Sequence, residues 1–468
     1  MIRFLIVLLA VLAARADAQP PEPEGEIVVA VDVSRSGNAW RADYRFLRPA
    51  RAWVFARSAL TRVGERPWRP QSWTIETPGV RLERRGYYDV LVAENGGPVP
   101  EHVRVRFTPF SQDLVADYDP ALIFTDGSVA LYSEQFDAIP IGSAAAAGRL
   151  PPDLARAELT YSRTSTTFRD RAGDVLHAGA RVPSVTISDD AGTYVLYGRV
   201  DPIETDAMTA IIDPQLPQWI GGALARSVPD ILARYADALG PSTGPKPTIM
   251  VSWAGPTPNL SSMGGSVLPG LIVMTYEGAG VLTESGGARE SGLWFIAHEA
   301  AHFWFGNTVR YQYSREAWIT EGGADLLAFR TVAEVDPAYD WRAALNQSIA
   351  DCVGLMQGRG VESAEERGEH RAYYACGAVF GLVAEASSGR PFSRFVRTLL
   401  DENRADGIVS RAEWLAALDR ASDDPELSRA IARLLDEGAE DPKAAIAALF
   451  TRASVRFTMG EDRLPRME

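Results

Sequence analysis

The sequence predicts a multidomain protein with an N-terminal antiparallel β domain, a mixed α/β region and a short helical C-terminal region. The chain has 468 residues, more than one hydrophobic core usually organises. Alternating and β-branched runs, broken by Gly, Pro, Asn and Asp, fill residues 27–200, whereas helical spacing of apolar residues becomes common after residue 201. A hydrophobic fraction of 46% and a charged fraction of 23% are ordinary for globular domains.

Residues 1–18 have the form of a secretory signal peptide. A basic start with Arg3 precedes an apolar run, and Ala16-Asp17-Ala18 offers small residues for cleavage. The apolar run is shorter than the roughly twenty residues that span a bilayer. We therefore expect an exported protein, periplasmic or extracellular, without a stable membrane anchor; an uncleaved N-terminal anchor is the alternative. Residues 19–26 are predicted to be a proline- and glutamate-rich linker.

The segment 27–200 is expected to form an antiparallel sandwich or saddle. Its apolar residues alternate or run together over short stretches, and turn-forming residues separate these stretches. The clearest strand-like segments are Ile27–Val33, Val103–Phe107, Ser128–Ser133, Val182–Ile187 and Gly192–Gly198.

The region 201–390 is expected to combine helices with buried strands. Residues 219–239 carry apolar side chains at helical spacing, although Pro229 is a position where the helix could break. The apolar runs 247–253 and 271–276 are typical of buried strands. Residues 391–468 show helical patterns and are predicted to form the C-terminal helical region.

The net charge excludes some classes of partner. A formal charge of −14 argues against nucleic acid or an anionic membrane, because both favour a basic protein surface. The charge does not define a reaction, and the sequence leaves the oligomeric state undetermined.

A histidine pair with metal-ligand spacing lies in an apolar segment. His298 and His302 are four residues apart, so a helix would project both from one face toward a single ion. Zinc binds imidazole nitrogen and carboxylate oxygen, and a catalytic zinc site keeps three protein ligands with one position open. Glu321, in the next predicted helix, is the candidate third ligand.

Glu299, which follows the first histidine, is the candidate general base. Zinc lowers the pKa of a bound water to roughly 7, so that a nearby carboxylate can accept its proton. A His-Glu-x-x-His string can also arise by chance. However, the chain has only five histidines, and the residues around this pair are mostly apolar, so unpartnered ionisable groups there would be costly.

The continuation of this motif resembles the zinc signature of the aminopeptidase N-like gluzincins. The segment His298-Glu-Ala-Ala-His-Phe-Trp-Phe-Gly-Asn307 is followed by Trp318-Ile-Thr-Glu-Gly-Gly-Ala324 at a similar spacing. The resemblance implies that His298, His302 and Glu321 bind one zinc ion per chain, that Glu299 is the base and that the substrate is a peptide. It also implies a thermolysin-like α/β catalytic domain over residues 201–390, preceded by the β domain.

The resemblance suggests further site residues. Asp325 resembles the carboxylate that orients a zinc-bound histidine in thermolysin-like members of the clan, although it could equally be an ordinary helix carboxylate. Tyr374, three residues before Gly377, resembles the tyrosine that donates a hydrogen bond to the oxyanion; a tyrosine merely packed on a helix is the alternative. Gln135 and Asp137 weakly resemble residues that hold the α-amine of the substrate; a polar loop after a strand is the alternative.

One expected residue of the family pattern is missing. The family has a Gly-x-Met-Glu-Asn motif whose glutamate binds the substrate amine, but the corresponding residues here are Gly264-Gly-Ser-Val-Leu268, with Val267 in place of the glutamate. An aminopeptidase must pair the ammonium group with a carboxylate. Asp137 or Glu277 are candidate substitutes, and exclusive action on free N-termini is in question.

The two cysteines, Cys352 and Cys376, indicate one disulfide in an exported chain; free buried thiols are the alternative. Together these features predict an exported zinc peptidase that is aminopeptidase-like. Two other functions are kept as alternatives: a zinc endopeptidase or oligopeptidase without a requirement for a free N-terminus, and a non-catalytic, zinc-stabilised binding protein.

Overall fold

The computed structural model describes residues 25–468 except 113, 116, 153, 155–156, 158, 161, 189–191 and 243–245. The predicted signal peptide, 1–18, and nearly all of the predicted linker, 19–26, lie outside the described residues. The chain divides into two compact units, which are described separately. The first comprises the described residues up to Gln218 together with Lys246–Thr283, and the second comprises Trp219–Pro245 and Glu284–Glu468, apart from the residues excepted above.

The first unit is built on a six-stranded sheet with the order β14-β11-β1-β2-β7-β4. Along β2 the side chains alternate between buried and exposed, with Trp40, Ala42 and Tyr44 in the core, as expected for a sheet with one solvated face. The strands are β1 (Glu26–Ser36), β2 (Ala39–Phe46), β4 (Trp73–Ile75), β7 (His102–Phe107), β11 (Ser162–Asp170) and β14 (Ser184–Ile187).

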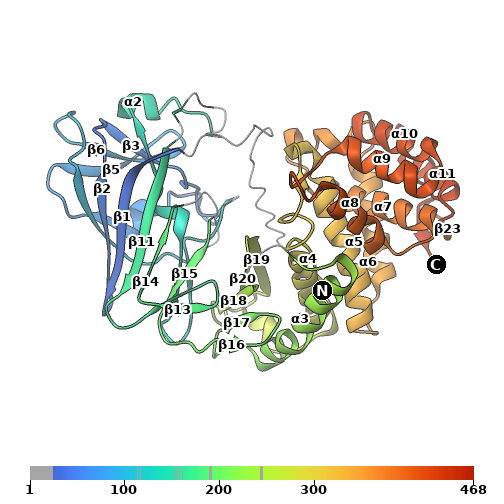
Figure 1. Ribbon diagram of the computed structural model, residues 1–468, viewed down its shortest axis with the longest axis horizontal. Helices are drawn as coiled ribbons and strands as arrows, with labels where there is room; N and C mark the ends of the chain where they lie inside the picture. The colour runs from blue at the N-terminus through green and yellow to red at the C-terminus, as the bar shows by residue number, and fades with distance from the viewer. Residues whose placement is uncertain are drawn as a thin grey trace. The chain divides into compact units, whose positions relative to one another are not determined.

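One pairing in this sheet differs from the antiparallel arrangement expected from the sequence. β1 and β11 run parallel, with Val31 opposite Thr166 and Val33 opposite Phe168, and lie side by side in Figure 1. Parallel neighbours require a long crossover connection, and the whole segment from β2 to β10 lies between these two strands in the sequence. Nothing in the local pattern of β11 indicates such a distant partner.

Two further sheets complete the β-rich part of this unit. Their orders are β10-β3-β6-β5 and β13-β12-β15-β9-β8. Buried aromatic residues such as Trp53, Phe136 and Tyr197 pack with residues of the six-stranded sheet in one core cluster. The elements are β3 (Ala52–Phe55), α1 (Arg69–Ser72), β5 (Val80–Arg85), β6 (Tyr88–Ala93), β8 (Ala121–Ile123), β9 (Val129–Tyr132), η1 (Ser133–Phe136), β10 (Ala138–Ile141), α2 (Ala144–Ala147), β12 (Val175–His177), β13 (Ala180–Val182) and β15 (Tyr194–Tyr197).

A mixed five-stranded sheet, β16-β17-β18-β20-β19, also belongs to the first unit. β17, β18 and β20 are parallel and buried, in agreement with the apolar runs at 247–253 and 271–276. β19 pairs antiparallel with β20 and is one of the two edge strands, the other being β16. The elements are β16 (Ile203–Glu204), β17 (Thr209–Ile212), β18 (Thr248–Trp253), β19 (Ser262–Leu268), β20 (Leu271–Glu277) and η3 (Ala279–Val281).

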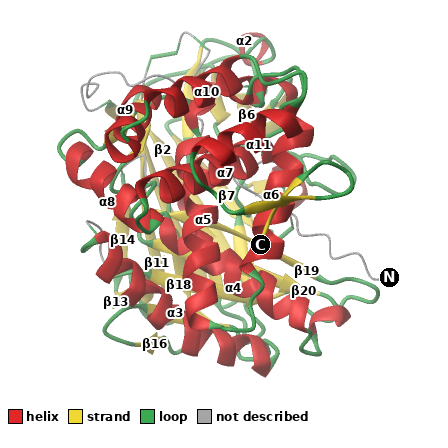
Figure 2. Ribbon diagram, turned by 90° about the vertical axis from the view of Figure 1, so that its right-hand side faces the viewer, coloured by secondary structure: helices red, strands yellow, loops and turns green. Residues whose placement is uncertain are grey.

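The second unit is helical. The helix expected at 219–239 is α3, and it continues through Pro229 without a break. α5 and α7 lie side by side (Figure 2), and α4 also packs on α5. The helices are α3 (Gln218–Leu239), α4 (Gly286–Ala301), η4 (Ser314–Glu316), α5 (Trp318–Val335), α6 (Trp341–Leu355), η5 (Val361–Ser363), η6 (Glu365–Arg367), α7 (Arg371–Ser388), α8 (Phe392–Asn403), α9 (Arg411–Ser422), α10 (Pro425–Asp436) and α11 (Pro442–Arg452).

The C-terminal region is helical with two small additions. β21 (Arg310–Tyr311) pairs with β22 (Ile408–Val409), and the chain ends in a hairpin of β23 (Phe457–Met459) and β24 (Pro465–Met467) where the sequence predicts helix. The turn of this hairpin is closed by a hydrogen bond from Gly460 N to Leu464 O, 3.0 Å long.

The architecture confirms a multidomain protein with N-terminal β-rich sheets and a helical C-terminal region. Within the described residues, no helix combines the length and the apolar character needed to cross a bilayer.

Candidate metal centre and active site

Three side chains of the helical unit converge at one point. His298 Nε2 lies 3.1 Å from His302 Nε2, and each of these nitrogens lies 3.5 Å from Glu321 Oε2. A tetrahedral zinc ion with bonds of about 2.05 Å separates its ligand atoms by about 3.3 Å. The triangle formed by the three atoms therefore has the dimensions of a zinc ligand set, and these residues are a group able to hold a metal ion.

The end of α4 positions both histidines. The helix begins after Ser285, whose hydroxyl accepts a hydrogen bond from Ala288 N, and its last residue is Ala301. His302 is the C-terminal cap and keeps helical backbone angles, φ −66° and ψ −16°. His302 therefore keeps the helical i, i+4 relation to His298 although it lies just beyond the last helical residue, and both rings face the same side.

The outward ring nitrogens are held by acceptors. His298 Nδ1 donates to Asp325 Oδ1 at 2.9 Å, and His302 Nδ1 donates to the carbonyl oxygen of Phe305 at 3.0 Å. An imidazole whose Nδ1 carries the proton offers the lone pair of Nε2. The two contacts therefore select the tautomers in which both Nε2 atoms are available to a metal.

The charges around the triangle favour a cation. Burial lowers the pKa of His298, but the hydrogen bonds to Asp325 and Glu321 outweigh it and raise this pKa to about 10. Burial raises the pKa of Glu321, but the histidines at 298 and 302 outweigh it and hold this pKa well below its usual range. An environment that stabilises a protonated imidazole in this way also stabilises a metal ion.

Glu299 is buried beside the ligand residues and is not one of the converging atoms. Burial raises the pKa of its carboxyl, and the opposing attraction of His298 and His302 is smaller. A carboxylate with a raised pKa is a better proton acceptor, because its proton affinity approaches that of the group it must deprotonate.

Tyr374 reaches the same site from α7. Its ring stacks on that of His298, with centroids 5.6 Å apart and an interplanar angle of 24°. Burial, followed by the charges of Glu321 and Glu299, raises the pKa of its hydroxyl well above the usual value. Tyr374 is therefore a neutral hydrogen-bond donor at neutral pH, as an oxyanion-binding role requires.

A glycine contact allows α5 and α7 to approach closely. A Cβ atom on Gly377 would lie 2.1 Å from Trp318 O, and one on Gly322 would lie 2.3 Å from Gly377 Cα. Gly322 follows the candidate ligand Glu321, and Gly377 comes three residues after Tyr374. The absence of side chains at this contact thus allows the helix that carries Tyr374 to lie close to the helix that carries Glu321.

The cysteines connect α6 to the middle of α7. Cys352 and Cys376 form a disulfide, and both are fully buried. The bond lies two residues from Tyr374 in the sequence and therefore anchors the helix that carries this tyrosine.

The predicted substrate-binding residues belong to the β-rich unit, not to the helical unit. Gln135 is buried in η1, and its Nε2 donates to Pro120 O at 2.6 Å and Tyr132 O at 3.0 Å. Asp137 caps the end of η1 and is half-buried. Glu277 ends β20 and accepts a hydrogen bond from Thr257 Oγ1 at 2.5 Å.

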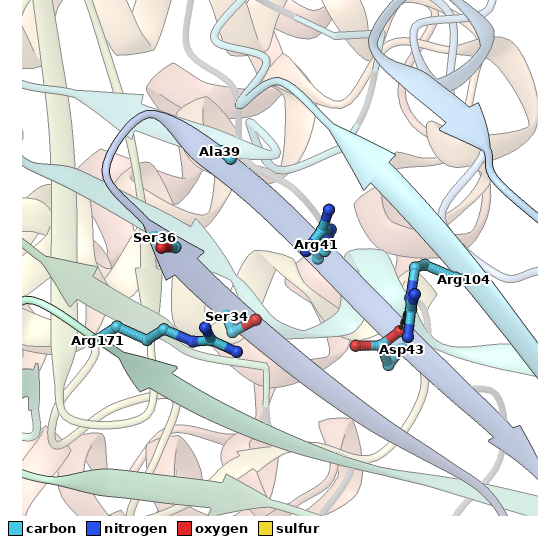
Figure 3. Close-up of a pocket in the computed structure, with 7 residues that line it drawn as sticks. All are labelled: Ser34, Ser36, Ala39, Arg41, Asp43, Arg104 and Arg171. Carbon is cyan, nitrogen blue, oxygen red and sulfur yellow. Dashed lines mark hydrogen bonds and ion pairs between the residues drawn. The ribbon is translucent and has the colours of Figure 1, made fainter.

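A separate small pocket lies on the six-stranded sheet (Figure 3). Its volume is about 130 Å³. Arg104 donates to Asp43 within it, which leaves two further arginines among its lining residues. None of the predicted site residues lines it. The lining residues are Ser34, Ser36, Ala39, Arg41, Asp43, Arg104 and Arg171.

Two residues beside the metal centre are absent from the sequence-based predictions. The Trp294 ring lies 5.8 Å from that of His298, between centroids, and Arg371 Nη1 lies 3.5 Å from Asp325 Oδ2. Trp294 precedes His298 by four residues, so the helical spacing that identified His302 could have found it. Arg371 is far from Asp325 in the sequence, and no local pattern indicates this contact.

Comparisons with known proteins agree with this site. Residues 269–426 match the family model described as the Peptidase family M1 domain. The puromycin-sensitive aminopeptidase of Caenorhabditis elegans is 36% identical over 61 residues, which are 13% of this chain and 6% of that relative. The match therefore spans a small part of the relative's length. The resemblance to aminopeptidase N-like zinc metallopeptidases expected from the sequence is confirmed.

Solved structures share the fold over most of the chain. An aminopeptidase N family protein from Idiomarina loihiensis has a TM-score of 0.61 at 10% identity, covering 90% of this chain and 78% of that one. Native yeast LTA4 hydrolase has a TM-score of 0.50 at 14% identity, covering 91% of this chain and 71% of that one.

Proposed function

We propose that the chain is a zinc-dependent, aminopeptidase-like hydrolase of peptide bonds with one zinc ion per chain, because residues 269–426 match the Peptidase family M1 domain. The observation that supports this most strongly is the ligand triangle of His298, His302 and Glu321 with Glu299 buried beside it. The proposal includes a thermolysin-like arrangement of α4 and α5 around the metal.

The residues of the site have separate roles in this proposal. His298, His302 and Glu321 would hold the ion, which when bound supplies a Lewis acid and lowers the pKa of water. Glu299 would accept a proton from the attacking water and return it to the leaving amine nitrogen. The Tyr374 hydroxyl, kept protonated by its raised pKa, would donate a hydrogen bond to the developing oxyanion.

The requirement for a free N-terminus is the part of the function that the experiment must decide, because Val267 stands where the family pattern has a glutamate. Val267 lies on β19, at the edge of the five-stranded sheet. This substitution favours, as a second candidate, an endopeptidase or oligopeptidase that accepts blocked peptides. A non-catalytic binding protein is disfavoured because both Glu299 and Tyr374 adjoin the ligands.

We also propose export, with cleavage after Ala18. The buried Cys352–Cys376 disulfide supports an oxidising compartment. Sequencing the N-terminus of protein recovered from the periplasm or medium would test this, since a mature chain that still begins at Met1 contradicts cleavage.

Glu299→Gln tests the catalytic proposal. We expect the variant to retain zinc at one ion per chain but to lose peptide hydrolysis by several orders of magnitude, because the amide cannot accept the proton. Metal analysis and hydrolysis of matched peptides with free and acetylated N-termini provide the measurement. Glu290→Gln, on the same helix, is the control and should behave like the wild type.

The peptide pair separates the candidates. Hydrolysis of free N-termini alone indicates an aminopeptidase, whereas hydrolysis of acetylated peptides indicates the second candidate. Zinc binding without any turnover that depends on Glu299 would contradict both and leave the binding protein.

A further inference from the structure

A chain of polar contacts leads from His298 away from the ligand triangle. His298 Nδ1 donates to Asp325 Oδ1 at 2.9 Å, and the other oxygen of Asp325 lies 3.5 Å from Arg371 Nη1. Arg371 Nε then donates to Asp351 Oδ2 at 2.9 Å. The four residues come from four different helices, α4, α5, α7 and α6.

The second carboxylate oxygen of Asp325 faces a cation, the guanidinium of Arg371. The side chain of Asp325 is fully buried, with 0% exposure. A buried carboxylate that faces only a neutral imidazole N–H would keep much of its desolvation cost. Once a metal occupies the triangle, His298 is such a neutral ring. Among the described residues, Arg371 is the arginine or lysine that forms an ion pair with Asp325.

Arg371 is itself held from the opposite side. The second carboxylate oxygen of Asp351 accepts a hydrogen bond from Gln347 Nε2 at 2.7 Å, which orients Asp351. The next residue, Cys352, is joined to Cys376 of α7 by the disulfide. The helix that carries Asp351 is therefore bound covalently to the helix that carries Arg371, so the spacing of the pair is constrained.

From these contacts we propose that Arg371 is a positioning residue for the metal centre. It bridges Asp325 and Asp351, and so holds Asp325 in the orientation that fixes His298 as a metal ligand. The inference rests on the proposed function of the triangle as a zinc site, and it adds α6 and α7 to the elements that determine metal affinity.

A matched ion pair distinguishes positioning from simple helix packing. Arg330 and Glu385 also join α5 to α7, with side-chain exposures of 27% and 18%, against 36% for Arg371. Within the part of the chain that the structure describes, neither residue forms a hydrogen bond or an ion pair with His298, His302 or Glu321. If Arg371 only stabilised the helices, its removal would resemble that of Arg330: a lower unfolding temperature and an unchanged affinity for zinc.

The test compares zinc affinity among variants of the full chain. Zinc dissociation constants are measured by chelator competition, and unfolding temperatures are measured on the metal-free proteins. We expect Arg371→Gln to weaken zinc binding about tenfold to a hundredfold, the usual range for residues that orient ligands. Asp351→Asn should weaken zinc binding by a smaller factor. Arg330→Gln should leave the dissociation constant within twofold.

Arg371→Lys refines the test. Lysine keeps the charge but lacks the planar fork that reaches two carboxylates at once, so we expect an intermediate affinity. At saturating zinc, the KM of Arg371→Gln for a peptide should equal that of the wild type, because Arg371 is not proposed to contact substrate.

The outcomes are separable. Arg371→Gln and Arg371→Lys with wild-type zinc affinity would overturn the inference while leaving the zinc peptidase intact. If Arg371→Gln does not fold, Arg371→Lys and Asp351→Asn decide the question by the same measurement. A wild-type protein that binds no zinc would overturn the proposed function, and the inference with it.

Discussion

At the scale of single residues, the chemistry of this site depends on how each polar atom is occupied. His298 and His302 each donate a hydrogen bond from Nδ1 to an acceptor, which leaves Nε2 available to a metal. The helical spacing of these histidines and the position of Glu299 are local features, and the sequence was sufficient to identify them. Tyr374 came from family resemblance, and its stacking on His298 could not be inferred from spacing because it joins two helices.

Tyr374→Phe is the prediction at this scale. Removing the hydroxyl should lower kcat about a hundredfold to a thousandfold, the usual effect of losing one oxyanion donor. Zinc affinity should be unchanged, because Tyr374 is not one of the converging ligand residues. Steady-state kinetics with a peptide substrate and chelator competition measure the two quantities.

Tyr373→Phe is the control for this variant. Tyr373 is buried on the same helix, but its hydroxyl contacts Glu365 N at 3.2 Å and Glu362 O at 3.4 Å rather than the metal centre. A Tyr374→Phe enzyme as active as Tyr373→Phe would argue against oxyanion stabilisation by Tyr374.

At the scale of elements, long amphipathic or apolar segments were predictable and distant pairings were not. α3 follows from the helical spacing of its apolar residues, and β18 follows from a continuous apolar run. The parallel pairing of β1 with β11 depends on a partner that is distant in the sequence, and the terminal hairpin β23–β24 depends on its turn. A short stretch of sequence does not reveal either feature. The contact of Gly322 with Gly377 belongs to the same class, although both glycines lie beside recognised motif residues.

Gly377→Ala is the prediction for this helix contact. The added methyl group would meet the backbone of α5, which cannot move as a flexible side chain can. We expect a loss of about 1 to 3 kcal/mol in unfolding free energy, as for other overpacked cores, together with reduced kcat as Tyr374 is displaced. Denaturant unfolding and kinetics provide the measurements.

Gly354→Ala is the matched control. Gly354 lies inside α6, and a Cβ atom there would have no neighbour within 4 Å. Alanine is favoured over glycine in a helix by about 1 kcal/mol, so this variant should be at least as stable as the wild type. Equal effects of the two substitutions would rule out the close approach as the cause.

At the scale of the whole molecule, the β-rich and helical parts were predictable from composition and patterning, because each pattern repeats over many segments. The two compact units, however, divide the sequence discontinuously: Lys246–Thr283 joins the β-rich unit although α3 precedes it. This division arises because β18 pairs with β17, which lies before α3 in the sequence, and β20 pairs in turn with β18.

Buried tyrosines in both units predict alkaline unfolding. Burial raises the pKa of Tyr44, Tyr194 and Tyr235 above its usual value. Above about pH 10 the unfolded chain loses phenolic protons that the folded chain keeps, so unfolding free energy falls as pH rises. Each such tyrosine should remove roughly 1.4 kcal/mol by about pH 11.

Denaturant unfolding at a series of pH values tests this expectation. In Tyr235→Phe the unfolding free energy should fall less steeply with pH, by the contribution of one buried tyrosine. Substitution of the exposed Tyr87 should leave this pH dependence unchanged. An unfolding free energy that stays constant between about pH 9 and about pH 11 would contradict the prediction.

The Cys352–Cys376 bond has a consequence for refolding. It closes a ring of chain with a sequence separation of 24, and Arg371 and Tyr374 both lie inside that ring. Closing a ring of this size lowers the entropy of the unfolded chain by an amount worth about 3 kcal/mol. A chain denatured without reduction therefore keeps these two residues on one covalent loop, and recovery of the site requires this loop to dock again on α4 and α5 as those helices re-form.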